Sequence, residues 1–329
     1  MRKWCVVVFA LAAAFGWANL VQAKGYPARP ITLIVSFAAG GPSDTAARLA
    51  ADHMSRTLGE QIIIENVPGA GGTAGAERAA KAAPDGYTIL FHHGALTRAP
   101  ALYSNLRYDT KAAFETIGLI NRGPMIVVSR KSLEARSAAE LFDYLKKNAD
   151  KVSLGHAGVG SNSYTCGLLL QRVLNQKLAF VAYRGTGPAM NDLVAGQIDA
   201  MCDQATNAVP QITAGTIKAY AITGDERIES VKEVPTSTEA GFPGLKMEIW
   251  NALYVPRGTP RDVVKTLNAA LQKALEDKTL VDKLIMLGTT PFPKSQRSPE
   301  AHRAYFLADL DVQARLLQGA GIKAVEAKD

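Results

Sequence analysis

Two glycine-rich turns contain the residues whose types and spacing fit one kind of chemistry, the binding of a small anion. The first turn spans residues 37–44 and the second spans residues 157–163, and each contains two glycines. Each turn lies between an apolar strand-like run and a helical pattern, so free backbone N–H groups and a helix N-terminus would point at one place. The sequence therefore predicts two anion cradles, one on each wall of a cleft.

The polar side chains of the two turns differ in charge. The second turn offers Ser161, Asn162 and Ser163, three uncharged hydrogen-bonding residues that suit an anion which must be released again. In the first turn, Ser43 or Asp44 can cap the helix that follows. Because the carboxylate of Asp44 would repel an anion, we expect it to be occupied by capping or by water. For either turn taken alone, an ordinary strand-to-helix connection is the alternative.

Further candidates follow other strands, since ligands of open α/β sheets bind beyond the carboxyl ends of the strands. His93 follows the run 87–91 and is a candidate donor, while Asp203 and Thr206 follow the run 197–202. Asp203 would accept a hydrogen bond from an ammonium group or a water, or would instead cap the next helix. The predicted ligand-binding residues are Phe37, Ala39, Gly40, Gly41, Ser43, Asp44, His93, Ala157, Gly160, Ser161, Asn162, Ser163, Tyr164, Tyr183, Asp203 and Thr206.

Signals for catalysis, metals and nucleotides are weak. The sequence has no Gly-x-Ser-x-Gly, His-Glu-x-x-His or Gly-x-x-x-x-Gly-Lys-Ser/Thr pattern. Gly158, Gly160 and Ser163 nearly match a dinucleotide loop, but no clear ribose-binding acid follows at a strand end. We therefore expect a protein that binds no metal and no cofactor and is not an enzyme. A small-molecule enzyme in the same cleft, with His93 as its base and Ser161 or Ser163 as its nucleophile, is the less favoured alternative.

Strand and helix patterns alternate along the chain, as in an α/β protein with a mostly parallel sheet. Apolar residues recur at helical spacing up to Leu58, and Gly59 ends that helix. The expected strands are 31–36, 61–65, 87–91, 125–128, 152–156, 179–183, 197–202, 217–223 and 247–255. The expected helices are 43–58, a segment ending at 83, 138–148, 163–174, a short segment ending at 196, 208–214, 260–277, 280–287 and 299–318.

The order of these elements predicts two lobes. The last helical segment lacks enough strands for a sheet of its own, so we expect it to pack back on the first unit. Lobe 1 would then be discontinuous, with residues 24–123 and 247–329, and lobe 2 would comprise residues 124–246. Because the chain would cross between the lobes twice, the crossings would form a hinge beside a central ligand cleft.

The N-terminus has the features of an export signal. Arg2 and Lys3 precede an apolar run, and small residues at 21–23 predict a cleavable signal peptide, residues 1–23, with cleavage after Ala23. The expected location is the periplasm. The full sequence carries a net charge of +7, which suits an anionic ligand. Its basic residues are scattered along the sequence, which gives no support to nucleic-acid binding.

Two cysteines, Cys166 and Cys202, follow the predicted signal peptide. An oxidising compartment would permit a disulfide bond between them. Two independent buried thiols are the favoured interpretation.

Motifs along nearly the whole mature chain resemble one family, the periplasmic binding proteins of tripartite tricarboxylate transporters, also called the Bug family. The matching segments include YPARPI at 26–31, the turn at 39–41 with Asp44, ENVPGAGG at 65–72, PDGYT at 84–88, GVGS at 158–161, YRG at 183–185 and LVAGQID at 193–199. The resemblance implies a two-lobed periplasmic binding fold, type II-like, that closes on a small carboxylate.

What the resemblance implies about the ligand is broad. The family binds dicarboxylates and tricarboxylates, acidic amino acids and aromatic acids, and the resemblance places carboxylate contacts at residues 39–41 and 160–163. It implies delivery to integral-membrane permease subunits by a monomer, with presentation to a signalling system as the alternative. This chain departs from the family pattern at Tyr164, where a histidine is common, and at residues 38–39, where a proline-containing pair is usual. The identity of the acid is therefore left open.

Overall fold

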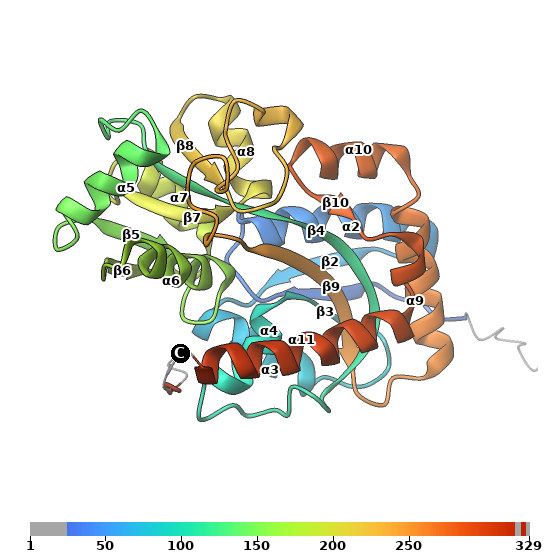
Figure 1. Ribbon diagram of the computed structural model, residues 1–329. Helices are drawn as coiled ribbons and strands as arrows, with labels where there is room; N and C mark the ends of the chain where they lie inside the picture. Colours follow the sequence, from blue (N-terminus) through green and yellow to red (C-terminus); the bar gives the residue numbers. More distant parts are fainter. Residues whose placement is uncertain (1–24, 320–323, 327–329) are drawn as a thin grey trace, which may run out of the picture.

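The computed structural model describes residues 25–319 and 324–326 (Figure 1). The predicted signal peptide, residues 1–23, lies outside the described residues. The strands are β1 (Ile31–Val35), β2 (Ile62–Asn66), β3 (Thr88–His93), β4 (Phe114–Arg130), β5 (Ser153–His156), β6 (Ala179–Ala182), β7 (Ala200–Gln204), β8 (Ile217–Ile222), β9 (Glu248–Pro256) and β10 (Thr290–Pro291). The α-helices are α2 (Pro42–Leu58), α3 (Thr73–Ala80), α4 (Ala95–Leu102), α5 (Ala138–Lys147), α6 (Asn162–Leu174), α7 (Thr186–Val194), α8 (Ala205–Thr213), α9 (Arg261–Ala274), α10 (Lys278–Met286) and α11 (Pro299–Gly319). Short 3-10 turns lie at Ala70–Gly72, Glu229–Val231 and Lys294–Gln296.

The strands form one mixed sheet in the order β2-β1-β3-β9-β4-β7-β5-β6, with β8 and β10 also paired to β4. The outer strands are parallel: β1 pairs with β2 and β3, and β5 pairs with β6 and β7. The central strands β4 and β9 are antiparallel to each other and to their other neighbours. The expectation of a mostly parallel sheet is therefore wrong for the centre of the molecule, although it holds for the outer strands of both halves.

Most elements lie within a few residues of their expected positions, because their apolar spacing and their end signals agree. Helix α2, for example, begins at Pro42 and ends where Gly59 adopts a left-handed conformation with φ of 71°. Three elements were not expected: α4, the first half of β4 before residue 125, and the two-residue strand β10. Helix α4 contains Pro100, and β4 is interrupted by two register shifts against β9, so neither shows a regular apolar period.

Strand β4 joins two halves of the molecule that have separate cores. It pairs with β9 as far as Pro124 and with β7 and β8 from Met125 onward. One core packs β1, β3, β9 and the first half of β4 against α2, α9 and α10, and another packs the second half of β4 with β5 and β7 against α5 and α6. Figure 1 shows β4 as a long curved strand running through both halves, in keeping with a two-lobed fold.

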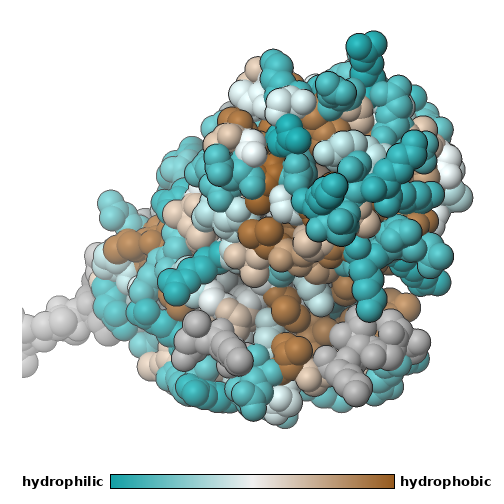
Figure 2. Space-filling view, turned by 90° about the vertical axis from the view of Figure 1, so that its left-hand side faces the viewer, coloured by the Kyte–Doolittle hydropathy of each residue, from teal (hydrophilic) through white to brown (hydrophobic). Residues whose placement is uncertain are grey.

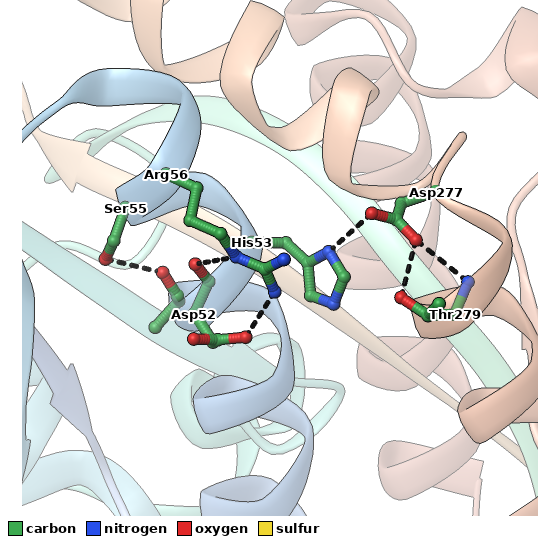
Figure 3. A network of polar contacts seen from close by, with 7 residues as sticks. Asp52, His53, Ser55, Arg56, Asp277 and Thr279 are labelled. Atoms are coloured by element: carbon green, nitrogen blue, oxygen red, sulfur yellow. Dashed lines mark hydrogen bonds and ion pairs between the residues drawn. The ribbon is translucent and has the colours of Figure 1, made fainter.

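The C-terminal helices α9 and α10 pack in one core with α2, β1 and β3. Figure 3 shows a contact that fixes this packing, in which His53 Nδ1 on α2 lies 3.1 Å from Asp277 Oδ2 at the start of α10. Asp277 also caps α10, because its other carboxylate oxygen accepts hydrogen bonds from the backbone N–H and the hydroxyl of Thr279. One side chain thus both begins α10 and holds it against α2.

The two cysteines form a disulfide bond, with their Cα atoms 5.9 Å apart. The favoured interpretation of two independent thiols is therefore wrong. The fold explains the outcome: Cys166 on α6 and Cys202 on β7 face each other because α6 packs directly on the central strand of this half. Sequence spacing alone does not reveal that packing.

The described surface has a mixed character. Figure 2 shows the face on the left of Figure 1, where polar and charged residues cover much of the area and apolar residues gather in a broken strip that runs from top to bottom near the middle. Among residues 25–319 and 324–326, no helix combines the length and the apolar composition needed to cross a membrane.

Candidate functional site: a cavity between two lobes

A small cavity lies between the two halves, at the ends of four helices. It is lined by Phe37, Gly41, Pro42, Ser43, His93, Ala157, Ser161, Asn162, Ser163, Thr186 and Gln204. The first residues of α2, α6 and α7 are among these, and Gln204 is the N-cap of α8. Four helix N-termini therefore converge on one point. The lining contains no aspartate, glutamate, lysine or arginine side chain. Such a site favours negative charge.

The first turn owes its shape to Asp44. Gly40 has a left-handed conformation with φ of 77°, and its N–H donates to Asp44 Oδ2 over 3.0 Å. The same carboxylate accepts hydrogen bonds from Arg48 Nε at 2.9 Å and from Asn66 Nδ2 at 3.0 Å. Burial alone would raise the pKa of Asp44, but these hydrogen bonds outweigh it and hold the pKa below its usual value. Asp44 is therefore an occupied anchor of the turn and does not line the cavity.

The second turn presents two serine hydroxyls in contact with each other. Ser161 Oγ accepts a hydrogen bond from the Tyr164 N–H, and Ser163 Oγ accepts one from the Ala157 N–H. The two hydroxyl oxygens lie 3.1 Å apart. Because two hydroxyl protons are available and the contact between the serines uses one, the other remains free to donate into the cavity.

His93 is a neutral donor beside the first turn. Its ring stacks on Phe37 with the centroids 4.7 Å apart, and its Nδ1 accepts a hydrogen bond from the Ala95 N–H over 3.1 Å. Burial lowers the pKa of His93 well below its usual value, and the nearby His92 and Arg98 add to the effect. The neutral ring therefore carries its proton on Nε2. The neighbouring His92 lies elsewhere, with its Nε2 3.2 Å from the Gly72 carbonyl oxygen.

The two halves touch around the cavity, so the structure represents a closed conformation. The Ala38 N–H donates to the Arg184 carbonyl over 3.0 Å, and the Tyr103 hydroxyl donates to the Val159 carbonyl over 2.7 Å. The cavity volume is about 10 Å³, close to the space that one water needs. A larger molecule can reach the lining residues only if the halves separate.

Half of the sequence-predicted residues line the cavity: Phe37, Gly41, Ser43, His93, Ala157, Ser161, Asn162 and Ser163. The others lie nearby but outside it. Ala39 and Gly40 belong to the backbone of the first turn, and the Gly160 carbonyl accepts a hydrogen bond from Arg98. The Tyr164 ring packs against His156 and Phe180.

Three predicted residues at or after strand ends, Tyr183, Asp203 and Thr206, also lie outside the lining. The Tyr183 hydroxyl donates to Asp192 over 2.7 Å, and Thr206 is buried in α8. Asp203 is fully buried and accepts hydrogen bonds from the Gln204 N–H and from Asn207. Burial raises the pKa of Asp203 to about 6. Both contacts lie at the start of α8, where Gln204 rather than Asp203 is the N-cap, and Asp203 does not line the cavity.

Sequence reasoning missed three lining residues, Pro42, Thr186 and Gln204. Gln204 was missed because β7 extends two residues beyond its expected end at Cys202. Thr186 lies in a glycine-containing turn that follows β6, and the same strand–turn–helix pattern that identified the other cradles could have identified it. Within the described part of the chain, no group of three His, Cys, Asp or Glu side chains could hold a metal ion.

A mixed α/β fold of two lobes that closes on a small polar cavity defines a class of proteins, the solute-binding receptors. A family model described as the tripartite tricarboxylate transporter family receptor matches residues 46–306, and the chain belongs to this family. It is therefore a binding protein rather than an enzyme.

Solved structures agree in fold along nearly the whole chain. The periplasmic binding protein BugD is 42% identical with a TM-score of 0.88, and the match covers 91% of this chain and 100% of BugD. MatC from Rhodopseudomonas palustris, solved with bound malate, is 40% identical with a TM-score of 0.85 over 89% of this chain and 100% of MatC. Another R. palustris protein, solved with adipate, is 28% identical with a TM-score of 0.85 over 91% of this chain and 100% of its own.

Proposed function

We propose that the protein captures a small organic carboxylate in the periplasm and delivers it to a tripartite tricarboxylate-type permease in the membrane. The observation that carries the proposal is the convergence of four helix N-termini on a cavity without charged lining side chains. An anion there meets backbone N–H groups, the free serine proton and the Nε2–H of His93. Because these donors are neutral, they bind a carboxylate without forming an ion pair that would slow its release.

Dicarboxylates are the ligands that we favour. MatC was solved with malate and the second R. palustris protein with adipate, and both acids carry a carboxylate at each end. The cavity has donors in both lobes, with Ser43 and His93 on one side and Ser161 and Asn162 on the other. Two carboxylates, or one carboxylate and a second polar group, would therefore bridge the lobes. The remaining family ligands, including tricarboxylates, acidic amino acids and aromatic acids, belong in the same test.

Binding would couple to closure of the lobes. We place lobe 1 at residues 24–123 and 247–329 and lobe 2 at residues 124–246, and the change of partners along β4 at residues 124–125 supports this division. The ligand stabilises the closed state to the extent that it binds that state more tightly than the open one. A permease would then distinguish loaded from empty receptor by shape. We propose that the receptor acts as a monomer whose mature chain begins at residue 24.

A thermal-shift screen of the mature protein tests the proposal. The panel contains malate, succinate, adipate, citrate, glutamate and benzoate, each at increasing concentration. A ligand at a hundred times its Kd adds about 2.7 kcal/mol to the free energy of unfolding, so a bound acid raises the midpoint clearly. If no acid of the panel raised the midpoint, and native mass spectrometry found no copurified acid, carboxylate capture would be excluded. Uptake of the bound acid by cells with and without the gene then tests delivery.

A further inference from the structure

A buried arginine reaches across the gap between the lobes beside the cavity. Arg98 lies on α4 in the first half of the chain and is 3% exposed. Its Nε donates to the Gly160 carbonyl over 3.0 Å, and its Nη2 donates to Asn162 Oδ1. Both acceptors belong to the second turn in the other half. We propose that Arg98 is a positioning residue, which turns the Asn162 amide so that its nitrogen donates to the bound carboxylate.

The donor and acceptor chemistry of the pair fixes the orientation of the amide. The oxygen and nitrogen of an asparagine side chain are often hard to distinguish, but an arginine has only donors. The atom of Asn162 that faces Arg98 must therefore be Oδ1, which leaves Nδ2 on the opposite side of the amide. Asn162 is 2% exposed and lines the cavity, and its Nδ2 has no hydrogen-bond partner among the described residues. A buried donor without a partner costs free energy that a ligand oxygen would recover.

The charge of Arg98 strengthens the same assignment. Among the described residues, no ion pair joins Arg98 to a carboxylate, and the acid whose charge acts on it, Asp309, accepts a hydrogen bond from Thr97 instead. Burial lowers the pKa of Arg98 to about 10, so the guanidinium remains charged at neutral pH. A buried cation is unfavourable unless an anion lies near it. A carboxylate bound on the far side of the Asn162 amide is such an anion.

The pair also makes the orientation depend on closure. Arg98 and Asn162 come from different halves of the molecule, so they meet only when the lobes are together. In an open receptor the amide is free to rotate and the guanidinium is hydrated. Closure therefore aligns the Asn162 donor at the moment when the carboxylate is enclosed. This inference rests on the proposed function, because it assumes that an anion occupies the cavity.

The experiment is a double-mutant cycle measured by calorimetric titration with the six acids of the panel. Arg98→Met keeps an unbranched apolar side chain as far as the position of Nε but removes the donors and the charge, and Asn162→Leu removes the amide. We expect each variant to weaken binding about tenfold or more. Because Arg98 acts through Asn162, the double variant should bind at most about threefold more weakly than the weaker single variant. Arg78→Met is the control, since Arg78 is exposed and pairs with Glu65 away from the cavity.

A second variant covers the case in which Arg98→Met fails to fold. Asn162→Asp keeps an oxygen for Arg98 and places a charged oxygen where the donor was. We expect its thermal midpoint without acid to be equal to or above that of the wild type, and its affinity for the acids to fall at least tenfold. If the Asn162 amide did not face the ligand, Asn162→Asp would bind the acids normally. Three results would each overturn the inference. They are normal binding by Asn162→Asp, wild-type affinity in Arg98→Met, and a loss of affinity in the double variant equal to the product of the two single losses. If the wild type bound no acid, the proposed function itself would fail.

Discussion

Ser161 shows how one side chain can serve the fold and the site together. It is the N-cap of α6, and the hydroxyl that accepts from the Tyr164 N–H also lines the cavity. Aspartate is as good an N-cap as serine, so a change to aspartate leaves the helix start satisfied. It also places a negative charge in a site that binds a negative charge. The substitution Ser161→Asp therefore separates the role of residue 161 as a helix cap from its role in ligand binding.

We predict that Ser161→Asp folds normally but weakens binding of the carboxylate at least about a hundredfold, which corresponds to about 3 kcal/mol. Calorimetric titration and thermal unfolding measure the two properties. Ser137→Asp is the matched control, because Ser137 caps α5 in the same way and does not line the cavity. Equal affinities for wild type and Ser161→Asp would move the binding site away from this turn.

His302 makes the stability of the protein depend on pH. It is fully buried on α11, its ring lies 4.7 Å from that of Tyr254, and neither ring nitrogen has a hydrogen-bond partner among the described residues. Burial lowers the pKa of His302 to about 3, and the charge of Arg303 adds to the effect. Below an unfolded-state pKa of about 6.5, the unfolded chain takes up a proton that the folded chain refuses. Stability is therefore lost as the pH falls from 6.5 towards 3.

We predict that His302→Leu removes this part of the acid sensitivity. The wild type should lose about 2 kcal/mol of stability from His302 alone between pH 8 and pH 5. The variant should lack that loss and bind the carboxylate normally, since His302 does not line the cavity. Urea unfolding of both proteins at the two pH values measures the difference. The same loss in both proteins would show that His302 is not the responsible group.

At the scale of elements, the sequence predicts the local features of the fold better than the long-range ones. The glycine turns after β1 and β5 could be found because the apolar strand, the turn residues and the helix cap follow one another directly in the sequence. Gln204 and Arg98 could not be found in this way. The position of Gln204 depends on how far β7 extends, and Arg98 lies on α4, which contains Pro100 and has no regular apolar spacing. The antiparallel centre of the sheet was missed for the same reason, because the first half of β4 shows no regular alternation.

The disulfide between α6 and β7 is the long-range link in the second half of the chain. It joins residues 36 positions apart, and a loop of that length implies about 4 kcal/mol of stabilisation in the chain-entropy model. Helix α6 follows the second turn, and β7 ends at Gln204, so the disulfide also fixes the positions of two walls of the cavity relative to each other.

We predict that reduction lowers the free energy of unfolding by about 3–4 kcal/mol. Urea unfolding with and without a thiol-free reductant measures the effect. The double variant Cys166→Ala/Cys202→Ala should be less stable than the wild type from the start and should not respond to the reductant. A wild type that the reductant leaves unchanged would contradict a stabilising disulfide.

At the scale of the whole molecule, closure depends on glycines where the two halves meet. A Cβ built on Gly187 would lie 2.9 Å from the carbonyl carbon of Gly40 and from the nitrogen of Gly41, and 3.0 Å from the Ala39 oxygen. These atoms are backbone, so they cannot move aside as the end of a flexible side chain can. Gly187 itself lies in α7, on the opposite lobe from the first turn. An alanine there obstructs the closed state alone.

We predict that Gly187→Ala separates folding from closure. Within α7, alanine is favoured over glycine by up to about 1 kcal/mol, so the thermal midpoint without ligand should stay the same or rise. The closed state loses its fit, so the affinity for the carboxylate should fall at least about tenfold. In small-angle X-ray scattering, an acid that makes the wild type more compact should leave the variant extended. Gly244→Ala is the control, since its Cβ would make only an ordinary contact of 3.4 Å with Val173. If Gly187→Ala bound the acid and contracted like the wild type, the contact between α7 and the first turn would not be part of closure, and the lobes would have to meet in another way.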